Sequence, residues 1–191
     1  MKNGKIITHK QTNAASISVQ DELYRIGLWH MESRLCNVEI FWCRLPHIKM
    51  YDALGFFVLG TTKLDEFFGY ETGHIYIPAF VLSQDFRQKR GSLRNIIRHE
   101  YGHAFAHHYP ELIIYSEKFE AVFGGNYYSD VPSEMEQEAY ISKYAKDMPM
   151  EDFAETFMVF VRRKGIIPAK ISNTKLKNKW AFVAKQIKRV S

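Results

Sequence analysis

The segment RHEYGH at residues 98–103 constrains the fold most, because it places two histidines and a glutamate at helical spacing. If residues 92–108 form a helix, His99 and His103 stand one turn apart, about 6 Å along the axis and about 40° around it. Both imidazoles can then reach one metal ion. Glu100 lies about 100° round from His99, too far to be a ligand but close to a water on that ion. The pattern is typical of zinc hydrolases and predicts Glu100 as the general base.

The opposite face of the same segment is apolar. Leu93, Ile97, Tyr101, Ala104 and Phe105 fall on the side away from the two histidines. One face would therefore pack against a core while the other coordinates the ion. The alternative is an ordinary amphipathic helix that matches the five-residue pattern by chance, and a suitable third ligand decides between the two.

A third histidine further along the chain does not supply that ligand. Zinc in a hydrolase normally has three protein ligands and a water. Position 109 is Tyr109 rather than histidine, which excludes the metzincin pattern. His107 lies one turn beyond His103, out of reach of an ion held by the pair, so we expect it to be a cap or a polar neighbour.

Two glutamate pairs spaced i, i+4 compete for the third position: Glu134 with Glu138, and Glu151 with Glu155. Such a pair suits one acid on the metal and one behind it that orients a ligand histidine. Only the second pair is flanked by a strong apolar stripe, which would hold its helix rigidly against the core. We therefore expect Glu151 to be the third ligand, with Glu155 as the next candidate.

The order of predicted elements indicates an α+β fold. The 191 residues are enough for one domain with a substantial core, and we expect a polar tail over residues 1–18 and a single domain over 19–191. Pro78 lacks an amide donor and ends or edges the strand before it. One helix, a small sheet and then only helices follow one another along the chain. Apolar spacing predicts helices at 19–34, 92–108, 111–123, 149–164 and 173–189, and strands at 38–45, 55–60 and 73–77.

Cysteine and leader patterns bear on the compartment. Cys36 and Cys43 are seven positions apart in a segment that reads as a strand, which is too extended for a disulfide, so we expect reduced thiols. Residues 1–18 lack the apolar middle of a signal peptide, and no run approaches the roughly 18 apolar residues that span a bilayer. We expect a cytoplasmic protein, or one exported without a recognisable signal peptide.

Charge is distributed unevenly towards the C-terminus. Residues 111–155 contain eleven acids and three bases, whereas residues 156–191 contain ten bases and no acid. The basic helix from Lys170 to Arg189 could contact nucleic acid or an anionic membrane, could neutralise the acidic neighbour, or could be only a solvated face.

The motif and the downstream glutamates together resemble a known family. Glu151 follows His103 by 48 residues, in the arrangement Tyr144-x6-Glu151-Asp-Phe-Ala-Glu155-x-Phe. This arrangement resembles the catalytic domain of anthrax lethal factor and the related Pro-Pro endopeptidases, which are zinc metalloproteases of the gluzincin kind. The likeness covers about residues 70–165 and implies a zincin-like domain with a small N-terminal mixed sheet.

The resemblance also implies roles for single residues. One Zn²⁺ per chain would be held by His99, His103 and Glu151, with Glu155 as an outer carboxylate. Tyr144 would donate a hydrogen bond to the oxyanion.

In that family an edge strand before the active-site helix binds an extended peptide. Residues 73–77 occupy the corresponding place, so Ile75, Tyr76 and Ile77 are the expected substrate contacts, and Tyr127 and Tyr128 are further candidates for the cleft. Asp152 stands where the family often has an aromatic residue, so the substrate class does not carry over.

The predicted function is therefore that of a zinc-dependent endopeptidase, which hydrolyses peptide bonds of a protein or peptide substrate through a metal-activated water. Two alternatives remain open. One is an intracellular regulatory zincin that cleaves a single partner, and the other is a non-catalytic binding protein that uses the basic C-terminal helix.

Overall fold

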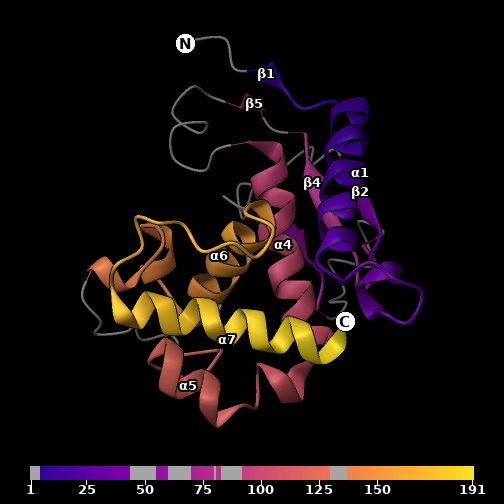
Figure 1. Cartoon of the computed structure of the whole chain (residues 1–191). Helices are drawn as coiled ribbons and strands as arrows, with labels where there is room; N and C mark the ends of the chain where they lie inside the picture. Colours follow the sequence, from indigo (N-terminus) through magenta and orange to yellow (C-terminus); the bar gives the residue numbers. More distant parts are fainter. Residues whose placement is uncertain (1–4, 44–54, 60–69, 80, 83–91, 130–136) are drawn as a thin grey trace.

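The computed structural model describes residues 5–43, 55–59, 70–79, 81–82, 92–129 and 137–191. The α-helices are α1 (His9–Arg25), α4 (Leu93–His108), α5 (Glu117–Phe123), α6 (Pro149–Arg162) and α7 (Thr174–Val190). The strands are β1 (Lys5–Ile6), β2 (Ile40–Cys43), β3 (Phe56–Phe57), β4 (Ile75–Pro78) and β5 (Val81–Leu82). Short 3₁₀ helices are η1 (Arg34–Asn37), η2 (Pro110–Leu112), η3 (Gln137–Ala139) and η4 (Tyr144–Lys146). The α+β class predicted from the sequence is confirmed (Figure 1).

Three strands form a mixed sheet in the order β2-β4-β3, and β1 pairs separately with β5. β4 runs parallel to β2, with Ile75 opposite Ile40, and antiparallel to β3, with Tyr76 opposite Phe56. The predicted small mixed sheet is thus confirmed. The prediction that residues 73–77 form an edge strand is wrong, because β4 is the middle strand and Pro78 only closes its end.

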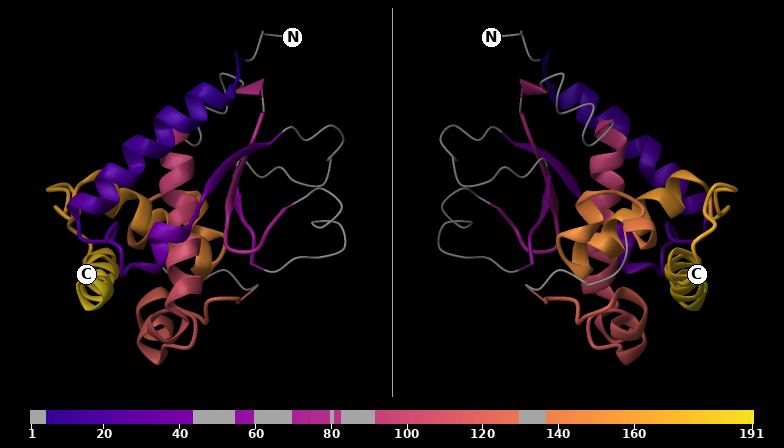
Figure 2. Two further views of the ribbon diagram at one scale, coloured as in Figure 1. Left: turned by 90° about the vertical axis from the view of Figure 1, so that its right-hand side faces the viewer. Right: turned by 90° about the vertical axis from the view of Figure 1, so that its left-hand side faces the viewer.

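The predicted active-site helix, α4, runs through the middle of the molecule and begins after Ser92, as expected. Figure 2 shows the three-stranded sheet on one side of α4 and the C-terminal helix α7 on the other. The residues Ile97, Tyr101 and Ala104 are fully buried along its length. The helix therefore has the apolar core-facing stripe that the sequence predicted, and α6 packs against it.

The first helix differs from the prediction. α1 begins at His9, inside the segment predicted as a polar tail, and ends at Arg25 rather than near residue 34. Thr8 caps it, accepting a hydrogen bond from the amide of Gln11, and the small polar residues Thr12 and Ser16 are buried on its packed face. Because the large apolar residues of that face, Val19 and Leu23, lie only in the second half of the helix, apolar periodicity could not reveal the first half.

The predicted helix over residues 111–123 is divided. Pro110–Leu112 forms η2, and α5 starts afresh after Ser116, whose side chain accepts a hydrogen bond from the amide of Phe119. Gly124 closes α5 in the left-handed conformation, with φ of 83°, as its position predicted. Both cysteines are free, as expected, although Cys36 lies in η1 rather than in a strand.

The basic C-terminal helix α7 packs on α5 and α6 through an apolar face. One of its lysines, Lys179, is fully buried and donates hydrogen bonds to Asp152 of α6 at 2.6 Å and to the carbonyl of Ala139 at 2.8 Å. Among the described residues, no helix has both the length and the apolar character needed to span a bilayer.

Candidate metal centre

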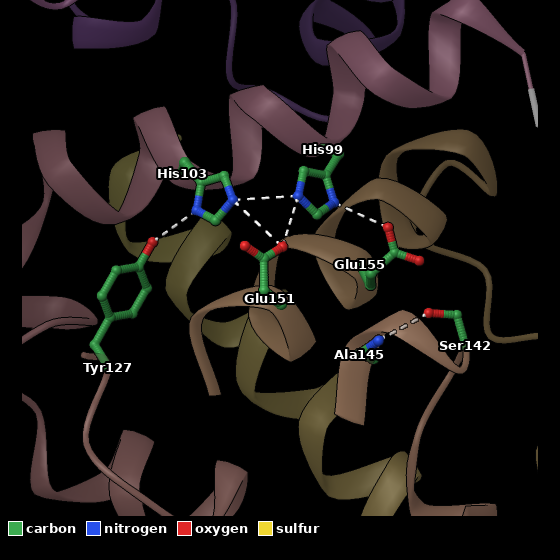
Figure 3. A network of polar contacts seen from close by, with 7 residues as sticks. All are labelled: His99, His103, Tyr127, Ser142, Ala145, Glu151 and Glu155. Carbon is green, nitrogen blue, oxygen red and sulfur yellow. Dashed lines mark hydrogen bonds and ion pairs between the residues drawn. The ribbon is translucent and has the colours of Figure 1, made fainter. Parts of the chain in front are cut away.

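Two buried imidazoles of α4 face each other across one helical turn. The Nε2 atoms of His99 and His103 lie 3.2 Å apart, and the ring planes meet at 75°. Their exposed fractions are 5% and 9%. The i, i+4 spacing predicted from the sequence thus brings the two rings to one point (Figure 3).

Glu151, in the first turn of α6, completes the group. Its Oε2 atom lies 3.0 Å from His99 Nε2 and 3.8 Å from His103 Nε2. Three atoms that can bind a cation, one from each residue, lie within 4.8 Å of one another. The structure therefore brings together the three ligands expected from the sequence, and it sets Glu138 of the competing pair on the exposed surface. Glu134 lies outside the described residues.

The close approach of α4 and α6 depends on Gly102, between the two histidines. A Cβ atom at position 102 would lie 2.9 Å from the Cα of Ala154, closer than real side chains approach. Because Ala154 lies between Glu151 and Glu155 in the sequence, this contact between α4 and α6 fixes where both carboxylates lie relative to the histidines. The glycine inside the motif is therefore a packing residue.

Each histidine has a second partner that fixes its orientation (Figure 3). His99 Nδ1 donates to Glu155 Oε1 at 2.9 Å, and His103 Nδ1 lies 3.0 Å from the hydroxyl oxygen of Tyr127. A proton on each Nδ1 leaves both Nε2 atoms with a lone pair, as metal-binding histidines require. Tyr127 was expected only as a cleft residue, and it lies instead behind His103, fully buried.

The chemistry of this group fits a divalent cation. Both Nε2 lone pairs and an oxygen of Glu151 point at the same small volume, and Glu151 Oε2 is buried without a well-formed hydrogen bond. Converging electron pairs repel one another unless a proton or a metal lies between them. Two imidazoles and a carboxylate are a usual donor set for zinc in hydrolases.

Protonation answers that repulsion when no metal is bound. Burial lowers the pKa of His99, but the neighbouring carboxylates of Glu151 and Glu155 outweigh it and raise the pKa to about 10. Burial raises the pKa of Glu151, yet both histidines hold it far below its usual value. In the metal-free site His99 is therefore protonated, and a bound cation would displace that proton.

A cleft of about 470 Å³ opens onto the histidines. Glu100, which is buried, and Tyr144, which is half-buried, both line it, and the Tyr144 ring centroid lies 5.8 Å from that of His99. The cleft also has an apolar component, formed by Phe56, Phe57, Leu59, Ile96, Met150 and Met158. The two residues expected to act on substrate are thus brought to the same cleft as the three candidate ligands.

The strand that borders the cleft is β3, an outer strand of the described sheet, rather than β4. Gly55, just before β3, lets the strand approach α4, since a Cβ there would lie 2.9 Å from the Ile96 side chain and 3.1 Å from Cγ of Glu100. Ile75 and Ile77 are buried in the core, and Tyr76 packs between Phe41 and Phe56. The expectation that these three β4 residues contact substrate depended on an edge position that β4 does not have.

His107 also lines the cleft, although the sequence suggested only a cap or polar neighbour. Burial, together with the neighbouring His103 and His108, lowers its pKa to about 4, so its ring is neutral near pH 7. Tyr128 lies beside it, half exposed, with ring centroids 6.1 Å apart.

Comparison with known proteins agrees with the geometry. A family model described as "Putative zinc-binding metallo-peptidase" matches residues 59–188, which is more than half of the chain and includes every candidate ligand. No curated protein and no solved structure matches the chain significantly. The chain therefore belongs to this family of zinc-binding metallo-peptidases.

Proposed function

We propose that the protein is a zinc-dependent endopeptidase that uses a metal-activated water. The observation that carries the proposal is the convergence of His99 Nε2, His103 Nε2 and Glu151 Oε2 in a cleft that also contains Glu100. A purely structural zinc site usually has four protein ligands, whereas three ligands beside an open cleft leave a position for water.

The bound zinc ion would supply a Lewis acid that lowers the pKa of water towards 7 and polarises the scissile carbonyl. Glu100 lies next to His99 in the sequence and lines the cleft, so its carboxylate would accept the proton as water attacks and pass it to the leaving amine. Tyr144, across the cleft on η4, would donate its hydroxyl proton in a hydrogen bond to the carbonyl oxygen as negative charge develops.

The substrate would be an extended peptide that lies in the cleft alongside β3. An outer strand can offer unpaired main-chain groups to a peptide, which would pair with it as an added strand. The Phe56, Phe57 and Leu59 side chains border the cleft on this side. The proposal thus moves substrate binding from Ile75, Tyr76 and Ile77 to residues 55–59.

The likeness to gluzincins of the lethal factor and Pro-Pro endopeptidase kind agrees with this arrangement. In both, a carboxylate that opens a later helix joins the two histidines, and a second glutamate one turn on supports a ligand. Asp152, the departure from that pattern, has its own partner here in Lys179, which supports the view that the substitution is compensated within the fold.

The two alternatives differ in their tests. A regulatory zincin that cleaves one partner shares this chemistry and differs only in the range of peptides it cuts. A binding protein that uses α7 would need the solvent-exposed lysines of that helix. Lys179 and the apolar face of α7 are instead buried against the rest of the fold. Contact with nucleic acid or an anionic membrane is therefore not needed to account for the helix.

The Glu100→Gln substitution tests the proposal. Gln keeps the shape of the side chain but cannot take a proton, so we expect one zinc per chain, an unchanged fold and a loss of peptide hydrolysis of about 10³-fold or more. Glu120→Gln, on the exposed surface of α5, is the matched control and should keep full activity. Chelator-sensitive cleavage of a peptide library by the wild type is the readout, and retained cleavage by Glu100→Gln would refute the role of Glu100.

A further inference from the structure

We propose that His107 determines substrate specificity. Its ring would border a subsite of the cleft that takes an uncharged side chain with a hydrogen-bonding group, a hydroxyl or a carboxamide, which would bond to the Nε2 atom once it displaces the side chains that cover that atom. This inference rests on the proposed peptidase function and adds to it a residue that selects the substrate.

The first support is position. His107 lies on the cleft face of α4, one turn beyond His103, and both residues line the same cleft. One turn advances about 5–6 Å along the helix, and an extended peptide advances about 3.3 Å per residue. A peptide in the cleft would thus present to His107 a side chain about two residues away from the bond held at His103.

The second support is an unmet hydrogen bond. The Nε2 atom of His107 is buried and has no hydrogen-bond partner among the described residues. Its ring neighbours are aromatic, with centroids 5.9 Å away for Phe57, 5.8 Å for Tyr127 and 6.1 Å for Tyr128. A buried polar atom in such surroundings is costly until something bonds to it, so a ligand that supplies the bond gains affinity.

The surroundings also decide the class of side chain. The aromatic rings around His107 offer no counter-charge, and the carboxylates of the cleft, Glu100, Glu151 and Glu155, belong to the metal centre, so a charged side chain at His107 would lose its hydration without compensation. A purely apolar side chain would leave Nε2 unpaired, and sites with an unpaired buried polar group reject such analogues strongly. A hydroxyl or a carboxamide satisfies both conditions, since either can donate to or accept from a neutral imidazole.

The neighbouring His108 shows that burial alone does not mark the site. Its Nε2 is also buried without a partner, and its ring lies 6.0 Å from that of Phe57. It does not line the cleft, however, because it lies about 100° further round the helix. Position in the cleft therefore separates the two histidines, and His108 provides a matched control.

The test measures peptide binding to the full-length, zinc-loaded protein in the inactive Glu100→Gln background, so that it does not depend on turnover. Peptides with one varied position carry Ser, Asn or Gln, an apolar counterpart (Ala or Leu), or a charged residue (Asp or Lys). Binding is measured for the background alone and with His107→Phe or His108→Phe added. The imidazole ¹⁵N signals of His107 are recorded with the peptides that bind.

We expect the background protein to prefer the hydroxyl or carboxamide peptides at one position by about tenfold or more. His107→Phe should remove that preference at that position only, while zinc content stays at one per chain, and His108→Phe should keep it. The bound peptide should also shift the His107 ¹⁵N signals. Equal weakening of all peptides by His107→Phe, or an unchanged profile, would overturn the inference. A wild type that binds peptides with this preference but hydrolyses none would contradict the proposed function and leave the His107 subsite standing.

Discussion

Glu151 and Asp152 are neighbours at the start of α6, and both are largely removed from solvent, but their carboxylates have different partners. Asp152 forms an ion pair with the buried Lys179 of α7, at 2.6 Å. Glu151 instead faces the Nε2 atoms of His99 and His103, so its potential partners carry lone pairs of their own. Asp152 therefore has a permanent counter-charge within the protein, whereas Glu151 has one only when a histidine is protonated or a cation binds.

The carboxylate of Asp152 contributes to the fold, whereas that of Glu151 is available to a ligand. Burial raises the pKa of Asp152, although Lys179 opposes that change, and burial lowers the pKa of Lys179. Both shifts mean that the charged pair is costly to bury and that each partner offsets part of this cost for the other. A group that lacks such a partner while buried at the same helix end is a candidate for binding.

Removal of Lys179 should have the largest effect on the fold. Lys179→Met leaves Asp152 buried without a counter-charge, which costs about 3–5 kcal/mol of the free energy of unfolding. Urea denaturation of the metal-free protein measures it. The double variant Lys179→Met/Asp152→Asn should recover much of that loss, because no charge is left unpaired. If the double variant is as unstable as the single one, the unpaired charge of Asp152 is not the cause of the lost stability.

Removal of Glu151 should affect metal binding rather than the fold. Zinc binding of about 10–16 kcal/mol is shared among its ligands, so Glu151→Gln should weaken zinc affinity by on the order of 10²–10³-fold. The unfolding free energy of the metal-free protein should change less than in Lys179→Met. Competition with a chromophoric chelator gives the affinity, and Glu138→Gln on the surface is the control. Wild-type affinity in Glu151→Gln would remove this residue from the ligand set.

The residues behind the histidines should have a smaller effect. Tyr127→Phe deletes the oxygen that lies 3.0 Å from His103 Nδ1, and loss of such an outer partner costs about 10–100-fold in metal affinity. Tyr128→Phe, its half-exposed neighbour, serves as the control and should bind zinc as the wild type does. Equal affinities in the two variants would show that Tyr127 only fills space.

The smallest expected effect is the release of a proton from His99 when zinc binds. With a pKa of about 10, against an ordinary value of 6.5, protonated His99 stabilises the metal-free fold fully below pH 6.5, and this contribution is lost as pH rises through about 10. Between those values zinc binding should release one proton and tighten about tenfold per pH unit. Calorimetry at pH 7.5 in two buffers of different ionisation enthalpy counts the protons. Release of none would mean that His99 is already neutral.

Local spacing explains what the sequence could predict. His99 and His103 meet because one helix carries both, and the apolar stripe around Glu151 identified the helix that packs beside them. The i, i+4 pair also anticipated that Glu155 would stand behind a histidine, where it now contacts His99. Each of these inferences depends on neighbours within one or two turns.

Contacts between distant segments were beyond such reasoning. Strand order decided that β4 is central, and no pattern within residues 73–77 contains that information. Tyr127 reaches His103 across 24 positions of sequence, and Lys179 looked like any other residue of a lysine-rich helix. The start of α1 was missed because Thr12 and Ser16 are buried without being apolar.

Anomalous diffraction at the zinc edge from crystals of the zinc-loaded protein tests the central claim most directly. We predict one strong peak per chain, about 2.0–2.2 Å from His99 Nε2, His103 Nε2 and an oxygen of Glu151, with a water at the fourth position. A peak elsewhere, or a Glu151 carboxylate turned away from a metal held by other residues, would contradict the account.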